Sequence, residues 1–95
     1  MSTKEMKYGS KHLIARLGLL SVGEFLRGWR LSEEMSLKKF GKLVALSPAN
    51  LCDVEKGRKG VSPEKAQAIA LAIGVPPALL VRLSLVDELK ALSLA

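Results

Sequence analysis

The side chains that most often carry catalysis or bind metals are scarce in this sequence. It contains one cysteine, Cys52, and one histidine, His12. One cysteine allows neither a disulfide framework nor a cysteine-based zinc site within a single chain. A nucleophilic triad or a Cys–His pair would depend on His12, which has no cluster of polar partners around it in the sequence. The sequence therefore predicts a protein that is not an enzyme and that uses no metal or cofactor.

Basic side chains are the more informative chemical group. The chain has 15 Lys and Arg residues against 9 Asp and Glu residues, a net charge of +6. Seven basic and three acidic residues fall within residues 36–65, whereas residues 66–95 contain two of each. A cationic centre beside a neutral, apolar C-terminal third is typical of a polyanion-binding surface joined to a surface for packing or association. The charge alone would also fit a chain whose positive charge serves only to keep it soluble.

The size and composition describe one small helical domain. Of the 95 residues, 48% are hydrophobic but only 4% are aromatic, so the core must be aliphatic, which favours helices over strands. No run of 18 apolar residues exists, so no segment is predicted to cross a membrane. Residues 13–22 mimic the core of a signal peptide, but Arg16 interrupts them and Glu24 follows at once. We therefore expect a cytoplasmic protein.

Helix-start signals divide most of the chain into helices, and no strand pattern is present. Ser21 and Glu24 form a capping box, and Ser47 and Ser62 each precede a proline that suits the first helical position. The expected helices are Val22–Glu34, Leu37–Val44, Pro48–Lys56, Pro63–Ile73 and one that starts near Pro77 and continues past Val86. Residues 1–20 are expected to be a polar arm, with helix-like apolar spacing over residues 11–20. The predicted fold is an all-α, compact bundle of about five helices with an N-terminal arm and an extended C-terminal helix.

Three segments are the most distinctive: VGEFLRGWR, MSLKKFGKLVALSPANLCDVEKGRK and VSPEKAQAIALAIGVPPALL. Together they resemble the helix-turn-helix domain of the lambda-Cro/XRE repressor family over residues 22–83. Two short helices joined by a three-residue turn match the supporting and recognition helices of that domain. The resemblance implies a lambda-repressor-like bundle whose third helix enters the major groove of DNA. We expect an arm at residues 1–20, a helix-turn-helix domain at residues 21–83 and a C-terminal helix extension at residues 84–95.

The resemblance also implies roles for individual residues. Residues 37–44 correspond to the supporting helix and residues 48–56 to the recognition helix. The residues that would meet base edges are Pro48, Ala49, Asn50, Cys52 and Asp53. The family's buried ion pair corresponds here to Arg30 and Glu55. Contacts with phosphates are expected from six basic residues of this region: Lys38, Lys39, Lys42, Lys56, Arg58 and Lys59. The alternative is that these side chains form only a solvated face.

Two features depart from the family pattern. The turn has Ala45 where the family often has glycine, and a left-handed alanine costs about 1–2 kcal/mol, so we expect a reshaped turn. The base-reading set contains no Arg, Lys or Gln, the usual readers of guanine and adenine. Asn50 could pair with adenine or serve only a local hydrogen bond at the helix start, and Asp53 could accept from cytosine or be merely exposed. We therefore expect weak direct base recognition, with sequence choice depending on DNA shape or on other segments.

The C-terminal segment carries more apolar residues than one small core requires. Leu79, Leu80, Leu83 and Val86 are expected to serve the core. A second stripe at helical spacing lies on another face and consists of Val81, Leu85, Leu89 and Leu92. An exposed apolar stripe usually marks an interface, so we predict a homodimer through residues 78–95. The alternative is that the tail folds back on residues 13–20.

The function predicted from these features is sequence-specific transcriptional regulation. The chain would bind double-stranded DNA as a dimer, as a repressor at a palindromic operator. One alternative is an antitoxin that represses its own promoter and binds a toxin protein. The other is a protein-interaction module that keeps the fold without binding DNA.

Overall fold

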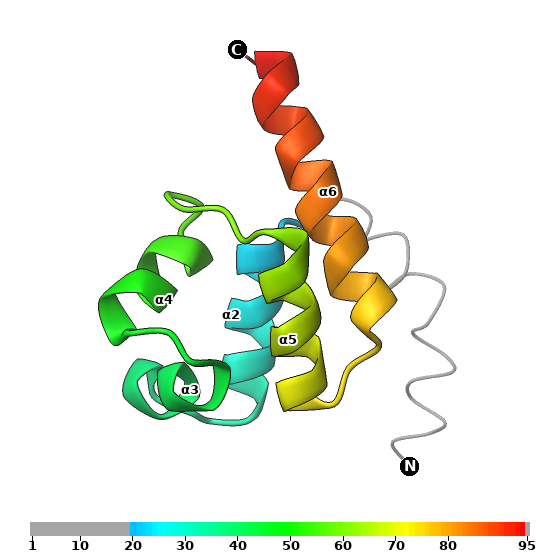
Figure 1. Cartoon of the computed structure of the whole chain (residues 1–95). Helices are drawn as coiled ribbons and strands as arrows, with labels where there is room; N and C mark the ends of the chain where they lie inside the picture. The colour runs from blue at the N-terminus through cyan, green and yellow to red at the C-terminus, as the bar shows by residue number, and fades with distance from the viewer. Residues whose placement is uncertain (1–19, 95) are drawn as a thin grey trace.

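Serine caps begin four of the five helices in the computed structural model, which describes residues 20–94 of the chain. Each serine hydroxyl accepts a hydrogen bond from a backbone amide three residues ahead, which satisfies a donor that has no partner inside the helix. The helices are α2 (Val22–Ser32), α3 (Leu37–Val44), α4 (Pro48–Glu55), α5 (Pro63–Ile73) and α6 (Pro77–Leu94) (Figure 1). No strand occurs within residues 20–94, so the predicted all-α class is confirmed. The expected arm, apart from its last residue, and His12 lie outside the described residues.

Two helices end earlier than the sequence predicts. Helix α2 ends at Ser32 rather than Glu34, because Glu34 takes a left-handed conformation with φ of 56°. Helix α4 ends at Glu55 rather than Lys56, and the chain leaves it through Gly57, whose φ is 79°. Glycine adopts that left-handed conformation without steric cost, which is why it serves as the end signal of the helix.

One aliphatic core holds the helices together, and it uses the stripes that the spacing of apolar residues predicts. The buried apolar residues are Val22, Leu26, Phe40, Val44, Leu51, Val54, Val61, Ala66, Ile69, Ala70, Leu80 and Leu83. Trp29 is half-buried at the edge of this core and stacks on Phe40, with 5.3 Å between the ring centroids. The core thus joins α2, α3, α4 and α5 and reaches only the first half of α6.

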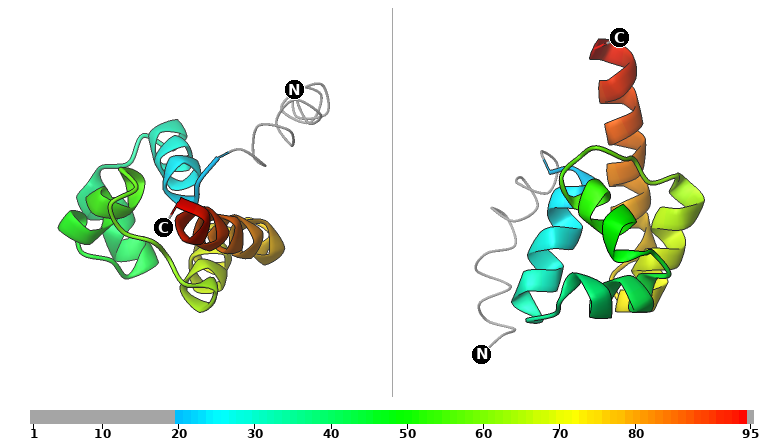
Figure 2. Two further views of the ribbon diagram at one scale, coloured as in Figure 1. Left: turned by 90° about the horizontal axis from the view of Figure 1, so that it is seen from above. Right: turned by 90° about the vertical axis from the view of Figure 1, so that its left-hand side faces the viewer.

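Helix α6 is divided between a packed half and a projecting half. Leu80, Leu83 and Ser84 are buried near its start, where it packs along α5. Its C-terminal half extends beyond the other helices in Figure 1 and in the right-hand view of Figure 2. Val81, which the sequence assigns to the outer stripe, instead packs partly against the core, and Val86 is only half-buried. No helix within residues 20–94 is long and apolar enough to cross a membrane.

A side chain from α6 caps the start of α2. Asp87 Oδ2 accepts a hydrogen bond from the backbone amide of Val22 at 3.0 Å. This contact joins residues 65 positions apart and places a carboxylate at the positive end of a helix dipole. Asp87 therefore joins α6 to the start of α2.

Candidate nucleic-acid interface

The turn between α3 and α4 keeps the geometry of a tight helix-turn-helix. Ala45 has φ of 59° and ψ of 44°, which is the left-handed conformation. The expectation that alanine would reshape the turn is therefore wrong. The amides of Ala45 and Leu46 both donate to the Gly41 carbonyl, the latter at 2.8 Å, and Lys65 Nζ donates to the Ala45 carbonyl at 3.3 Å. These hydrogen bonds hold Ala45 in a left-handed conformation that alanine disfavours.

Gly41 makes the close approach of this turn possible. A Cβ atom at that position would overlap the backbone carbonyl of Leu46. Gly23 has the same role on the other side of α4, where a Cβ atom would overlap the carbonyl of Val54. Helix α4 is thus held between α2 and the turn at backbone contact distance, which fixes its position relative to α3.

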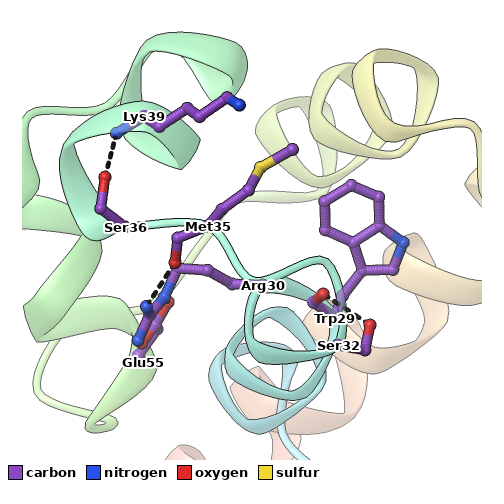
Figure 3. A network of polar contacts seen from close by, with 7 residues as sticks. All are labelled: Trp29, Arg30, Ser32, Met35, Ser36, Lys39 and Glu55. Atoms are coloured by element: carbon purple, nitrogen blue, oxygen red, sulfur yellow. Dashed lines mark hydrogen bonds and ion pairs between the residues drawn. The ribbon is translucent and has the colours of Figure 1, made fainter.

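A buried ion pair fixes the C-terminal end of α4 to α2. Arg30 Nε lies 2.8 Å from Glu55 Oε2, and Arg30 Nη2 donates to Glu55 Oε1 at 3.0 Å, which makes a bidentate pair (Figure 3). The remaining guanidinium nitrogen Nη1 donates to the Met35 carbonyl at 2.9 Å. The two side chains are only 13% and 4% exposed. The hydrogen bond to Glu55 raises the pKa of Arg30 above its usual value, against the opposing effect of burial, so the guanidinium stays charged up to strongly alkaline pH.

Helix α4 carries the five residues assigned to base reading. Pro48 and Ala49 are exposed at the start of the helix, and Asn50, Cys52 and Asp53 are half-buried. Two of the five are engaged by basic side chains from the loop that follows. Lys59 Nζ donates to Asn50 Oδ1, and Arg58 Nη1 lies 3.6 Å from Asp53 Oδ1.

The loop after α4 is tied back to the helix by its own backbone. The amides of Arg58 and Lys59 both donate to the Asp53 carbonyl, at 2.8 and 3.3 Å. The Gly57 amide donates to the Val54 carbonyl at 3.1 Å, so the Asp53 and Val54 carbonyls near the end of α4 are satisfied inside the protein. This geometry holds the two basic side chains of the loop beside α4.

The six basic residues assigned to phosphate contacts are all exposed. Lys38, Lys39 and Lys42 lie on α3, and Lys56, Arg58 and Lys59 follow α4. The structure therefore places cations on α3, before α4, and on the loop after α4. A phosphate backbone that passes over α4 would meet positive charge on both sides.

Three structural residues of this site were missed by reasoning from the sequence. They are Gly23, whose missing Cβ admits α4, Lys65, which donates to the turn, and Asp87, which caps α2. Gly23 stands inside the capping box, and the sequence gave no signal of its contact with Val54 of α4. Lys65 and Asp87 act through contacts between helices that the sequence spacing does not reveal.

These features define a class of protein. The sequence pattern of the helix-turn-helix domain family matches residues 21–83, about two thirds of the chain. The chain therefore belongs to the helix-turn-helix domain family, and the resemblance seen in the sequence is confirmed.

Two curated relatives carry a regulatory name. This chain is 36% identical over 55 residues to the transcriptional regulator ClgR of Mycobacterium tuberculosis, in strain CDC 1551 / Oshkosh and in strain ATCC 25618 / H37Rv. The matched segment covers 58% of this chain and 49% of either relative, so the chain matches about half the length of these proteins. No solved structure matches the chain significantly.

Proposed function

We propose that this chain is a transcriptional regulator that binds double-stranded DNA through α4 and represses from a palindromic operator as a homodimer. The observation that carries the proposal is the exposed start of α4 between two groups of exposed cations. Pro48 and Ala49 are free to enter a groove, while the lysines of α3 and the basic loop after α4 lie where the flanking phosphates would pass. The relatives named as transcriptional regulators support the same interpretation of the fold.

The salt dependence of DNA binding tests this proposal. The probe is the DNA upstream of the protein's own gene, in a mobility-shift titration of the full chain at several salt concentrations. Each phosphate contact is expected to contribute about −0.9 to the slope of log affinity against log salt. Replacing Lys38 and Lys42 together by alanine is expected to make that slope less negative by ~2 and to weaken binding to all sequences.

Lys90 provides the matched control for that experiment. It is exposed on the projecting half of α6, so Lys90→Ala removes one positive charge away from α4 and is compared with each single α3 variant, Lys38→Ala and Lys42→Ala. The slope should change little in this variant. Affinity that is insensitive to salt, or equal slopes for the wild type and the α3 double variant, would count against a phosphate-binding surface on α3.

The proposed dimer rests on the projecting half of α6. Leu85, Leu89 and Leu92 are 46%, 62% and 73% exposed, and they follow one another at helical spacing. A second copy of the same helix would cover them, and a twofold pair would present two recognition helices to two half-sites. Val81 belongs to the core side of α6 and is left out of this interface.

Sedimentation of a charged variant tests the dimer. Leu85→Lys with Leu89→Lys is expected to lower the mass from two chains to one, because both side chains are exposed and the core should survive. The control is Leu71→Lys, since Leu71 is 67% exposed on α5 and outside the stripe. An unchanged mass in the α6 variant would remove the dimer from the proposal.

The same leucines favour a second candidate function, that of an antitoxin whose C-terminal helix covers a toxin. This alternative predicts that the chain copurifies with the product of a neighbouring toxin gene. The α6 double variant should then lose that partner while it still binds the upstream DNA.

A further inference from the structure

The strongest observation that the proposed function leaves unused is the contact between Lys59 and Asn50. These residues lie nine positions apart, in the loop after α4 and in the first turn of α4. The loop backbone returns to the Asp53 carbonyl, and this return brings the lysine alongside the helix. Lys59 is thus not directed only outward at phosphates, as the sequence suggests, but bonds a residue of the base-reading face.

The chemistry of this contact fixes the orientation of the amide. An ammonium group has three donors and no acceptor, so only the oxygen of Asn50 can face it. The amide nitrogen of Asn50, with its two N–H donors, is then the end that remains available. The ammonium keeps two further N–H donors of its own. The two side chains together therefore present hydrogen-bond donors.

A surface made of donors selects among bases. Asparagine reads adenine by accepting from the N6 amino group and donating to N7. The bond from Lys59 takes one of the two acceptor sites of the Asn50 oxygen and brings further N–H donors beside it, which disfavours the donor N6 group of adenine. Guanine presents two acceptors in the major groove, N7 and O6, and no donor at that edge. We propose that Asn50 and Lys59 act as one unit that reads guanine, which replaces the expected pairing of Asn50 with adenine and rests on the proposed binding of α4 in the major groove.

Asp53 fits the same base pair. It lies three residues after Asn50, hence on the same side of α4, and its carboxylate is an acceptor. The cytosine paired with guanine offers an N4 amino donor in the major groove. Donors at Asn50 and Lys59 and an acceptor at Asp53 thus match the pattern of one G·C pair.

Selection from a random pool tests this proposal, because it requires no chosen operator. The full chain is used to select duplexes with a randomised centre, and the selected sequences are compared between the wild type and Lys59→Met, which keeps an unbranched side chain as far as Cε and removes the ammonium donors. The wild type is expected to prefer guanine over adenine at one position of each half-site by roughly 5- to 100-fold. In Lys59→Met that preference should fall or pass to adenine at this position, because the oxygen of Asn50 becomes available.

Two further variants separate base reading from simple charge. Lys56→Met removes the same charge from an exposed residue at the end of α4 that contacts neither Asn50 nor Asp53, so it should weaken binding to all sequences and leave the base preference unchanged. Asn50→Ala should remove the preference at the position that Lys59→Met alters. All three residues lie at the surface of α4 or its loop, and circular dichroism of each variant verifies the fold.

Two results would overturn the inference, and they are distinguishable. If the wild type selects a defined sequence and Lys59→Met weakens binding with an unchanged base preference, Lys59 is a phosphate contact only and the proposed function stands. If the folded wild type enriches no sequence and retains no duplex, both the guanine reading and the proposed function fail.

Discussion

Helix α4 carries two acidic residues two positions apart, and each faces an arginine, yet the two ion pairs differ in every physical respect. Glu55 on the inner face forms a bidentate pair with Arg30 at 2.8 Å, and both side chains are nearly excluded from solvent. Asp53 on the outer face lies 3.6 Å from Arg58, with side chains that are 32% and 66% exposed. The inner pair joins two helices that are distant in sequence, whereas the outer pair joins a helix to the loop that follows it.

The comparison shows that position and recognition are separate properties of the same eight-residue helix. The position of α4 is determined by the inner pair, by Gly23 of α2 and by Leu51. These residues join α4 to α2 and to the core. The outer pair and the contact between Asn50 and Lys59 determine which groups α4 offers to a ligand. Changes on the outer face should therefore alter binding at little cost in stability, and changes on the inner face should do the reverse.

The largest effect is expected from removing one partner of the inner pair. Arg30→Ala leaves the Glu55 carboxylate buried without its partner and should lower the free energy of unfolding by about 3–5 kcal/mol. Urea denaturation followed by circular dichroism measures this loss. Replacing both residues, Arg30→Met with Glu55→Leu, is the control and should lose much less, because no unpaired charge remains. A loss from Arg30→Ala below about 1 kcal/mol would mean that the pair is no more than a surface contact.

The next effect concerns the backbone contact beside that pair. Gly23→Ala places a Cβ atom against the Val54 carbonyl, and the helix must move to relieve it, so the domain should lose about 1–3 kcal/mol. Gly28 lies on the same helix with open space around it, so Gly28→Ala should instead stabilise by up to ~1 kcal/mol. Thermal unfolding of the two variants measures whether each substitution raises or lowers the stability of the domain. Equal effects from both would show that α2 and α4 are not in close contact at Gly23.

The third effect is a gain in stability, and it comes from the turn between α3 and α4. Ala45→Gly relieves a left-handed alanine, which should raise the free energy of unfolding by ~1 kcal/mol after the greater flexibility of the unfolded chain is counted. Ala68→Gly, on the exposed side of α5, is the same substitution in a helix interior and should cost ~1 kcal/mol. Chemical denaturation of the two variants measures whether their changes in the free energy of unfolding have opposite signs. A loss in both variants would argue against the left-handed turn.

The same contrast explains how far the sequence could be interpreted without a structure. The serine caps, the proline starts and the apolar stripes predict the five helices, because these signals act within one or two turns of the chain. The resemblance to the family supplies the partnership of Arg30 and Glu55. Close approaches such as that of Gly23, and the contact of Lys59 with Asn50, depend on where the chain returns in space, and no local spacing encodes them. The left-handed Ala45 is mispredicted because the tertiary contacts that hold it outweigh its local preference.

The smallest effect on stability is expected from the outer pair. Arg58→Met breaks a contact of 3.6 Å between partly exposed side chains, so the free energy of unfolding should change by no more than about 0.5 kcal/mol. The same variant should weaken DNA binding and make the slope of log affinity against log salt less negative by ~1, since it removes one proposed phosphate contact. Urea denaturation and the mobility-shift titration measure the two quantities on one preparation. A loss of stability close to that of Arg30→Ala would contradict the division of α4 into a positioning face and a recognition face.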